Sequence, residues 1–262
     1  MLVIVIYSVV IFAATIIGAL VGMGGGVIIK PVLDMLGYHT VEVVGFISTC
    51  AVFAMSISSS VKHIRAKTEM QPKIVLLVSL GSIAGGIVGN EIFDRVFERF
   101  NTDIVKGIQA VIIAAFLIFV IFYVNMDLKS YKLKNPAAIV VTGLFLGLMS
   151  AFLGIGGGPI NTAFLVLLFS FTVKESAVYS VAIIFFSQLS QLITIFINNQ
   201  FKPYIQYWPI ILAACIISVI GGIIGSQLNR KCTDKVITKV FSLTLAFVVI
   251  INIFNAVKGF TA

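Results

Sequence analysis

The sequence is poor in charged residues and in cysteine, and it lacks the common catalytic motifs. Charged side chains make up 11% of its 262 residues, whereas a soluble domain carries about 25%, so a soluble globular domain is excluded. Cys50, Cys215 and Cys232 show no CxxC spacing and predict neither a disulfide framework nor a metal site. They are best explained by packing, with a sulfur-relay role for Cys50 as the alternative. HExxH and GxSxG are absent, and we expect no catalytic residue and no cofactor.

Long apolar runs are what the sequence has in abundance. Hydrophobic residues make up 60% of the chain, and its mean hydropathy is +1.13. A membrane-spanning helix needs ~20 apolar residues. Runs that reach or approach this length cover residues 2–21, 43–61, 74–90, 104–124, 137–153, 176–197, 204–226 and 240–257. They do not alternate with polar residues, as barrel strands would. The fold class predicted is therefore an all-α polytopic membrane protein, with the lipid bilayer as its surroundings.

The chain contains an internal repeat. GMGGG at 22–26 recurs as GIGGG at 154–158, an offset of 132 residues. The same offset aligns Thr40 with Thr172, Ser48 with Ser180, Phe53 with Phe185, and Ser58 with Ser190. Transporters are often built from two such halves. We predict a first repeat over 1–124, a polar cytoplasmic connector over 125–136 and a second repeat over 137–262.

The distribution of basic residues predicts how the two halves are oriented. The net charge of +8 comes from Lys and Arg spread over short loops, as membrane topology requires, and does not indicate a nucleic-acid partner. If each of the eight apolar runs crossed the membrane once, nine basic residues would lie on each side, and the positive-inside rule would favour neither orientation. If each glycine break is instead the tip of a hairpin, five lie at one end (Arg95, Arg99, Lys106, Lys202 and Lys258) and twelve at the other, with Lys30 near a tip. The positive-inside rule then favours two inverted repeats, each a glycine-broken helical hairpin plus three transmembrane helices, in the cell membrane with both termini outside. If both arms of each hairpin crossed the membrane fully, the basic residues would be distributed between the two sides in the same way. The charges therefore leave this variant open.

Each glycine break is expected to lead into a half-helix. Residues 27–37 cover ~16 Å, about half of the ~30 Å hydrocarbon core. Non-helical backbone at this depth is tolerated where it lines protein or a cavity, and a helix N-terminus there suits an anion. We therefore predict that two facing breaks bind a small anionic substrate. The predicted backbone ligands are Gly22, Gly24, Gly25, Gly26, Gly154, Gly156, Gly157 and Gly158.

Polar side chains near the breaks complete the predicted site. Lys30 lies one helical turn after Gly26, and a lysine in an apolar helix indicates function, although it could instead extend along its stem to the surface. Asn161 and Thr162 occupy the corresponding place in the second half. Secondary candidates from the next helix of each half are Ser56, Ser59, Gln188 and Gln191, for which ordinary interhelical hydrogen bonds are the alternative. The glycines of GGIVG and GGIIG, at 85–89 and 221–225, are assigned to helix packing.

Two glycine-broken halves of this kind resemble the TauE/SafE family of sulfite exporters. The residues that carry the resemblance are GALVGMGGGVIIKP, GLMSAFLGIGGGPIN and the two GGxxG helices, and it covers residues 5–257. It implies a permease for sulfite, sulfur-containing organic anions or related small oxyanions. We expect alternating access by a movement of one half against the other. A passive anion channel and a membrane-embedded enzyme are the alternatives. The oligomeric state is left open by the sequence.

Overall fold

Every regular element in the described part of the chain is a helix. The computed structural model describes residues 2–99, 102–126, 130–153 and 157–261. Its helices are, in order, α1 (Leu2–Val21), α2 (Gly26–Leu36), α3 (Val41–Arg65), α4 (Pro72–Arg99), α5 (Thr102–Asn125), α6 (Pro136–Leu153), α7 (Gly158–Phe169), α8 (Val173–Ile197), the short 3-10 helix η1 (Lys202–Tyr207), α9 (Trp208–Lys231) and α10 (Asp234–Thr261). The predicted all-helical membrane fold is confirmed.

Six helical segments among the described residues are long and apolar enough to cross a membrane. They are Leu2–Val21, Val41–Arg65, Pro72–Gly89, Val173–Ile197, Lys202–Lys231 and Asp234–Phe254. Shorter apolar segments cover Val111–Asn125, Pro136–Ala151 and Gly158–Phe169. The first hairpin has unequal arms, because α1 has 20 residues and α2 only 11. At 1.5 Å per residue α2 is ~16 Å long, so it is the half-helix that the sequence predicts.

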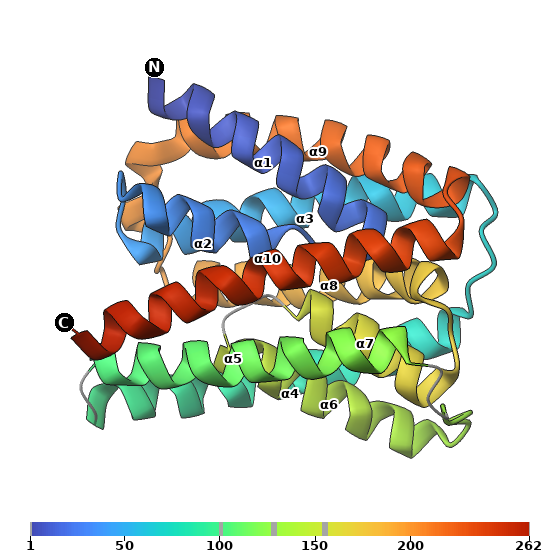
Figure 1. The fold of residues 1–262 in the computed structure, drawn as a ribbon. Coiled ribbons are helices and arrows are strands. Elements are labelled where there is room, and N and C mark those ends of the chain that lie inside the picture. Colours follow the sequence, from blue (N-terminus) through green and yellow to red (C-terminus); the bar gives the residue numbers. More distant parts are fainter. Residues whose placement is uncertain (1, 100–101, 127–129, 154–156, 262) are drawn as a thin grey trace.

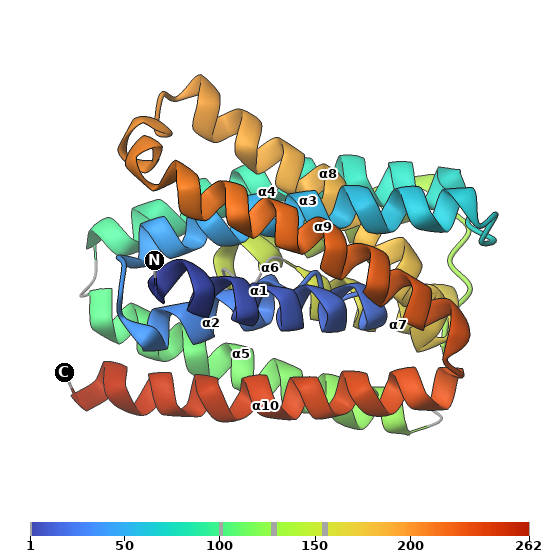
Figure 2. The same ribbon diagram turned by 90° about the horizontal axis from the view of Figure 1, so that it is seen from above.

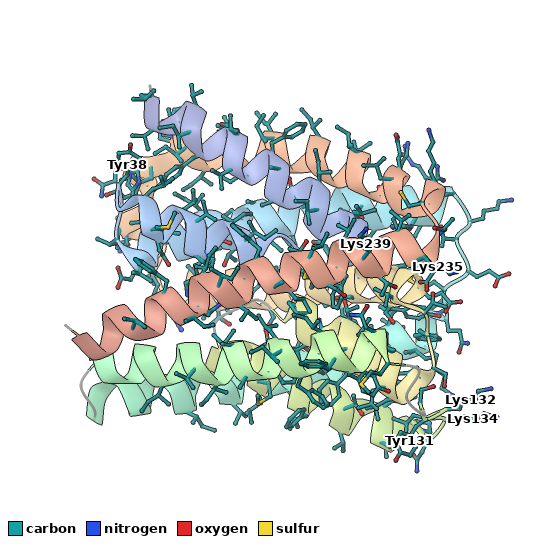
Figure 3. The ribbon with its side chains drawn as sticks, in the orientation of Figure 1. Tyr38, Tyr131, Lys132, Lys134, Lys235 and Lys239 are labelled. Carbon is teal, nitrogen blue, oxygen red and sulfur yellow. The ribbon has the colours of Figure 1, made fainter. Side chains whose placement is uncertain are left out.

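The helices lie side by side, and both termini are at the same end of the bundle (Figure 1). We call this the terminal end. Tyr131, Lys132 and Lys134 lie at the opposite end, together with Lys235, whereas Tyr38 lies at the terminal end (Figure 3). We call the opposite end the connector end. Both the hairpin arrangement and eight simple crossings would place the two termini at one end, so this placement does not distinguish them. Which end faces the cytoplasm stays a prediction.

The offset of 132 residues reappears in the helix boundaries. α3 and α8 each have 25 residues, and both their first and last residues are related by this offset. Thr40 and Thr172 are the N-caps of these two helices, and Thr172 forms a capping box with Glu175. Gly25 and Gly157 are likewise the N-caps of α2 and α7. The repeated sequence pattern therefore marks repeated local structure.

Helices of the two halves pack against each other in matching pairs. α1 packs along α9 and α6 along α4, so the first helix of each half lies on the fourth helix of the other. α3 packs on α8, and α5 packs on α10. Figure 2 shows the α5–α10 pair along one face of the bundle, with α1 and α2 between it and α3. The halves are interleaved and share one core. Their inverted relation and the boundary at 125–136 stay predictions.

Glycines allow the closest of these helix contacts. A Cβ atom at Gly81 or Gly85 of α4 would overlap backbone carbonyls of α6, at Val140 and Leu144. α6 presents glycines to α4 in the same way, and Gly225 of α9 does so towards α1, whereas a Cβ at Gly221 would overlap the side-chain hydroxyl of Thr15. Gly86 differs, because nothing lies within 4 Å of the position its Cβ would take. The packing role predicted for these glycines therefore holds for Gly85, where a Cβ would overlap α6. At Gly86 there is room for a Cβ, so close packing does not explain why this residue is a glycine.

Candidate substrate-binding site

The first break is a run of left-handed backbone between α1 and α2. Gly22, Gly24 and Gly25 have φ values of 79°, 77° and 72°, a region in which residues with a Cβ are strained. Gly25 is the N-cap of α2, and no side chain caps the helix there. The chain thus reverses within a few residues and presents an uncapped helix N-terminus inside the bundle.

The second break has the same form where it is described. Gly157 has φ 75° and is the N-cap of α7, again without a side-chain cap. Pro159 is at the start of this helix, where its missing N–H costs no hydrogen bond. Gly154 and Gly156, also predicted as ligands, lie outside the described residues.

The two breaks contact each other directly. A Cβ atom at Gly158 would overlap the backbone of Met23, so the two backbones touch at this point. The Thr162 hydroxyl donates to the carbonyl oxygen of Gly22 at 3.5 Å, and the Ser180 hydroxyl donates to the same oxygen at 2.6 Å. The sequence predicts that the breaks lie close together, and they do. No space for a ligand separates Met23 from Gly158, so a ligand that both breaks held would have to lie beside this contact.

α3 and α8 form the walls around the first break. Val52 of α3 and Ile184 of α8 border Gly24, and Ala177 borders Gly22. The two walls meet where the aligned residues Phe53 and Phe185 stack, with ring centroids 5.6 Å apart. Residues 22–25 and 157–158 are all buried. The first break and the described residues of the second are therefore enclosed by protein.

Not every amide hydrogen of the breaks is available to a ligand. The Gly24 N–H donates to the carbonyl oxygen of Gly18 at 3.3 Å, which uses one of the predicted donors. An α-helix offers no intrahelical acceptor to its first N–H groups. Gly26, Val27, Gly158 and Ile160 contribute the N–H groups in the first turns of α2 and α7, whereas Pro159 has no N–H.

The predicted polar side chains of the half-helices lie next to the breaks. Asn161 and Thr162 are buried in the first turns of α7, and the Asn161 amide nitrogen lies 3.5 Å from the position of a Cβ at Gly157. Lys30 is in α2, one turn after Gly26, and is partly buried.

The four secondary candidates on α3 and α8 differ from one another in their surroundings. The Ser56 hydroxyl donates to Phe53 of its own helix at 2.7 Å, which fits the alternative of a simple local bond. Ser59 is fully buried, and no partner for its hydroxyl occurs among the described residues. Gln188 is buried, but Gln191 is exposed and accepts a hydrogen bond from Thr49 at 3.4 Å. The two glutamines do not share one buried face, because α8 leaves the core beyond residue 190.

Ser48, Ser150 and Ser180 border the breaks although the sequence analysis does not select them as ligands. Ser180 contacts both breaks, the Ser48 hydroxyl lies 3.5 Å from a Cβ position at Gly26, and the Ser150 hydroxyl lies 2.8 Å from one at Gly157. The alignment of Ser48 with Ser180 at the repeat offset is the signal that points to two of them. Ser150 has no such signal.

Comparison with known proteins identifies the family. The model of the family described as "Sulfite exporter TauE/SafE" matches residues 7–252. The chain belongs to the TauE/SafE family. It is 25% identical to the probable membrane transporter protein YunE of Bacillus subtilis, over 88% of this chain and 90% of that protein. It is also 25% identical to the probable membrane transporter protein MJ0441 of Methanocaldococcus jannaschii, over 86% of this chain and 85% of that protein.

Another relative is much longer than this TauE/SafE protein. The probable membrane transporter protein MamO of Paramagnetospirillum magneticum is 25% identical over 89% of this chain, which spans 42% of MamO. No solved structure matches the chain. Family and relatives together indicate a membrane transporter rather than an enzyme.

Proposed function

We propose that this TauE/SafE protein is a secondary transporter of a small, sulfur-containing oxyanion of the sulfite or organosulfonate class. The observation that carries the proposal is the meeting of two uncapped helix N-termini at the contact between Met23 and Gly158. Helix N-termini favour anions through free N–H groups and a partial positive charge. Broken helices that meet between two repeats are a common form of transporter substrate site.

The anion lies beside the Met23–Gly158 contact, within reach of both helix N-termini. N–H groups of the first turns of α2 and α7 donate to its oxygens. Asn161 supplies neutral donors from α7, and Lys30 supplies a positive charge from α2. Because the oxyanion carries its charge on several oxygen atoms, donors from two directions suit it better than a single strong ligand.

Transport requires that the enclosed breaks become accessible from each end in turn. In the present structure the first break and the described residues of the second are buried, and a movement of one repeat against the other would open them. A passive anion channel would conduct through the same pocket without such a movement. Slow, saturable flux into liposomes would support a transporter, whereas single-channel currents in a planar bilayer would contradict it.

Ligand binding is tested by thermal unfolding of the purified protein with sulfite, sulfate, thiosulfate and a sulfonate. A ligand at about 100 times its Kd stabilises the folded protein by about 2.7 kcal/mol. We expect a saturable rise of Tm with at least one sulfur oxyanion and a smaller rise with chloride at equal ionic strength. Equal shifts with all of these salts would contradict a specific site.

Replacing Lys30 tests the positive side chain. We expect Lys30→Ala to weaken oxyanion binding, since a hydrogen bond to a charged group contributes about 1.5–3 kcal/mol, which is roughly tenfold or more in Kd. Lys30→Arg keeps the charge and should retain part of the affinity. The measurement is the ligand concentration that gives the half-maximal Tm shift. An unchanged value in Lys30→Ala would remove Lys30 from the site.

A further inference from the structure

Four oxygen atoms converge where the two breaks meet. The Ser180 hydroxyl oxygen lies 2.6 Å from the carbonyl oxygen of Gly22 and 3.4 Å from that of Gly158. The Thr162 hydroxyl oxygen lies 3.5 Å from the Gly22 carbonyl oxygen. The side chains of Ser180 and Thr162 are both 0% exposed. We call these four atoms the oxygen cluster. It joins α1, α7 and α8, and no single helix could form it.

We propose that the oxygen cluster binds a sodium ion that is coupled to transport of the anion. This inference rests on the proposed function and adds the coupling ion to it. Gly22 directly follows the last residue of α1, so the negative end of that helix dipole points at the cluster. Carbonyl groups of unwound segments and helix C-termini are the groups with which broken transporter helices coordinate cations.

The chemistry of the four ligands favours a small monovalent cation. All four are neutral oxygens, which suit a hard cation but do not offset the charge of a buried divalent ion. A cation of the size of Na⁺ or Ca²⁺ holds oxygen ligands at roughly 2.3–2.6 Å, so two ligands at right angles are about 3.4 Å apart. Two of the measured separations have this value. The third, at 2.6 Å, widens once the Ser180 hydroxyl hydrogen turns away from Gly22 and leaves its oxygen to the ion.

The internal repeat supplies an independent argument. Ser180 and Gly158 align with Ser48 and Gly26 of the first half, and this pair is also in contact, because a Cβ at Gly26 would lie 3.5 Å from the Ser48 hydroxyl. The position of Thr162, however, is taken in the first half by Lys30. The first half therefore has a cationic residue at this position of its half-helix, and the second half has a residue with a neutral hydroxyl. A free cation bound at Thr162 restores the equivalence of the two halves.

A cation at the cluster is coupled to the anion through Gly158. The N–H of this residue belongs to the first turn of α7, on the anion side, and its carbonyl oxygen belongs to the cluster. Opposite charges held on the two sides of one residue attract each other in surroundings that exclude water. Each ion therefore raises the affinity for the other by the same factor.

The test measures sodium binding without any oxyanion. Purified protein in detergent is unfolded by heat in mixtures of NaCl and choline chloride, at constant ionic strength and constant chloride. We expect a saturable rise of Tm with Na⁺ and a clearly smaller one when KCl replaces NaCl. Ser180→Ala and Thr162→Val should each raise the half-maximal Na⁺ concentration at least tenfold. Thr162→Lys, which copies the first half, should make Tm independent of Na⁺.

Ser176→Ala is the matched control. Ser176 is also a fully buried serine of α8, one turn before Ser180, and it is not part of the cluster. We expect its Na⁺ dependence to be unchanged. Equal shifts with Na⁺, K⁺ and choline, or an unaltered Na⁺ response in both Ser180→Ala and Thr162→Val, would overturn the sodium site. If a sulfur oxyanion still raises Tm in that case, the proposed function stands. A Na⁺ response with no oxyanion response would instead contradict the proposed function.

Discussion

Gly158→Ala is expected to lose its native fold or to retain it with a large loss of stability. The added Cβ would overlap the backbone carbonyl of Met23, and neither backbone can move away easily. Met23 is held between residues of left-handed conformation, and Gly158 is held in the first turn of α7. Overpacking that side chains can relieve costs about 1–3 kcal/mol, and a clash between two backbones should exceed this range. The yield of monodisperse protein and its Tm in detergent measure the effect.

Gly26→Ala is the control, because Gly26 occupies the same place in the first repeat. Its Cβ would meet only side-chain atoms, Val52 Cγ2 at 3.3 Å and Ser48 Oγ at 3.5 Å. Small shifts of these groups can accommodate a methyl group, and alanine also favours the helix over glycine. We expect Gly26→Ala to fold with a Tm close to that of the parent protein. Equal damage from both substitutions would show that the contact between the breaks does not decide the outcome.

The sequence predicts the parts of the fold that depend on local physics. Apolar runs predict that these helices exist, because a helix that is apolar on all sides can be recognised without knowledge of its partners. Their ends are predicted less well, since α4 continues nine residues beyond the run 74–90 and α10 begins six residues before the run 240–257. The glycine breaks are predictable for the same reason, since three glycines in sequence cost a helix about 1 kcal/mol each. The repeat offset aligns Thr40 with Thr172, and in the structure both residues are N-caps.

Contacts between distant segments could not be predicted in this way. Nothing in the sequence shows that Gly158 touches Met23, or that Ser180 joins the carbonyl oxygens of both breaks. Gln188 and Gln191 illustrate the same limit, because their spacing of three residues places them on one side of a helix but does not show where α8 leaves the core. The geometry of a single helix determines which side of it a residue occupies. Whether that side is buried depends on how all the helices pack together.

Gly85→Ala is expected to destabilise the protein strongly, whereas Gly86→Ala is expected to have little effect. Both residues lie in α4, and both substitutions change helix propensity equally. A Cβ at Gly85 would overlap the carbonyl oxygen of Leu144, so α4 and α6 would have to separate along their contact. A Cβ at Gly86 meets nothing within 4 Å. We expect Gly85→Ala to lower the Tm by many degrees or to prevent purification of folded protein, and Gly86→Ala to leave the Tm unchanged or slightly higher.

The comparison of these neighbours separates packing from propensity. In a membrane, helices associate through close packing of small residues rather than through the removal of apolar surface from water. A separation of α4 from α6 therefore weakens many dispersion contacts at once, and lipid cannot restore the same geometry. Since α4 lies in the predicted first repeat and α6 in the predicted second, this loss should also weaken the contact between the two predicted repeats. Equal Tm values for Gly85→Ala and Gly86→Ala would contradict the backbone contact between the two helices.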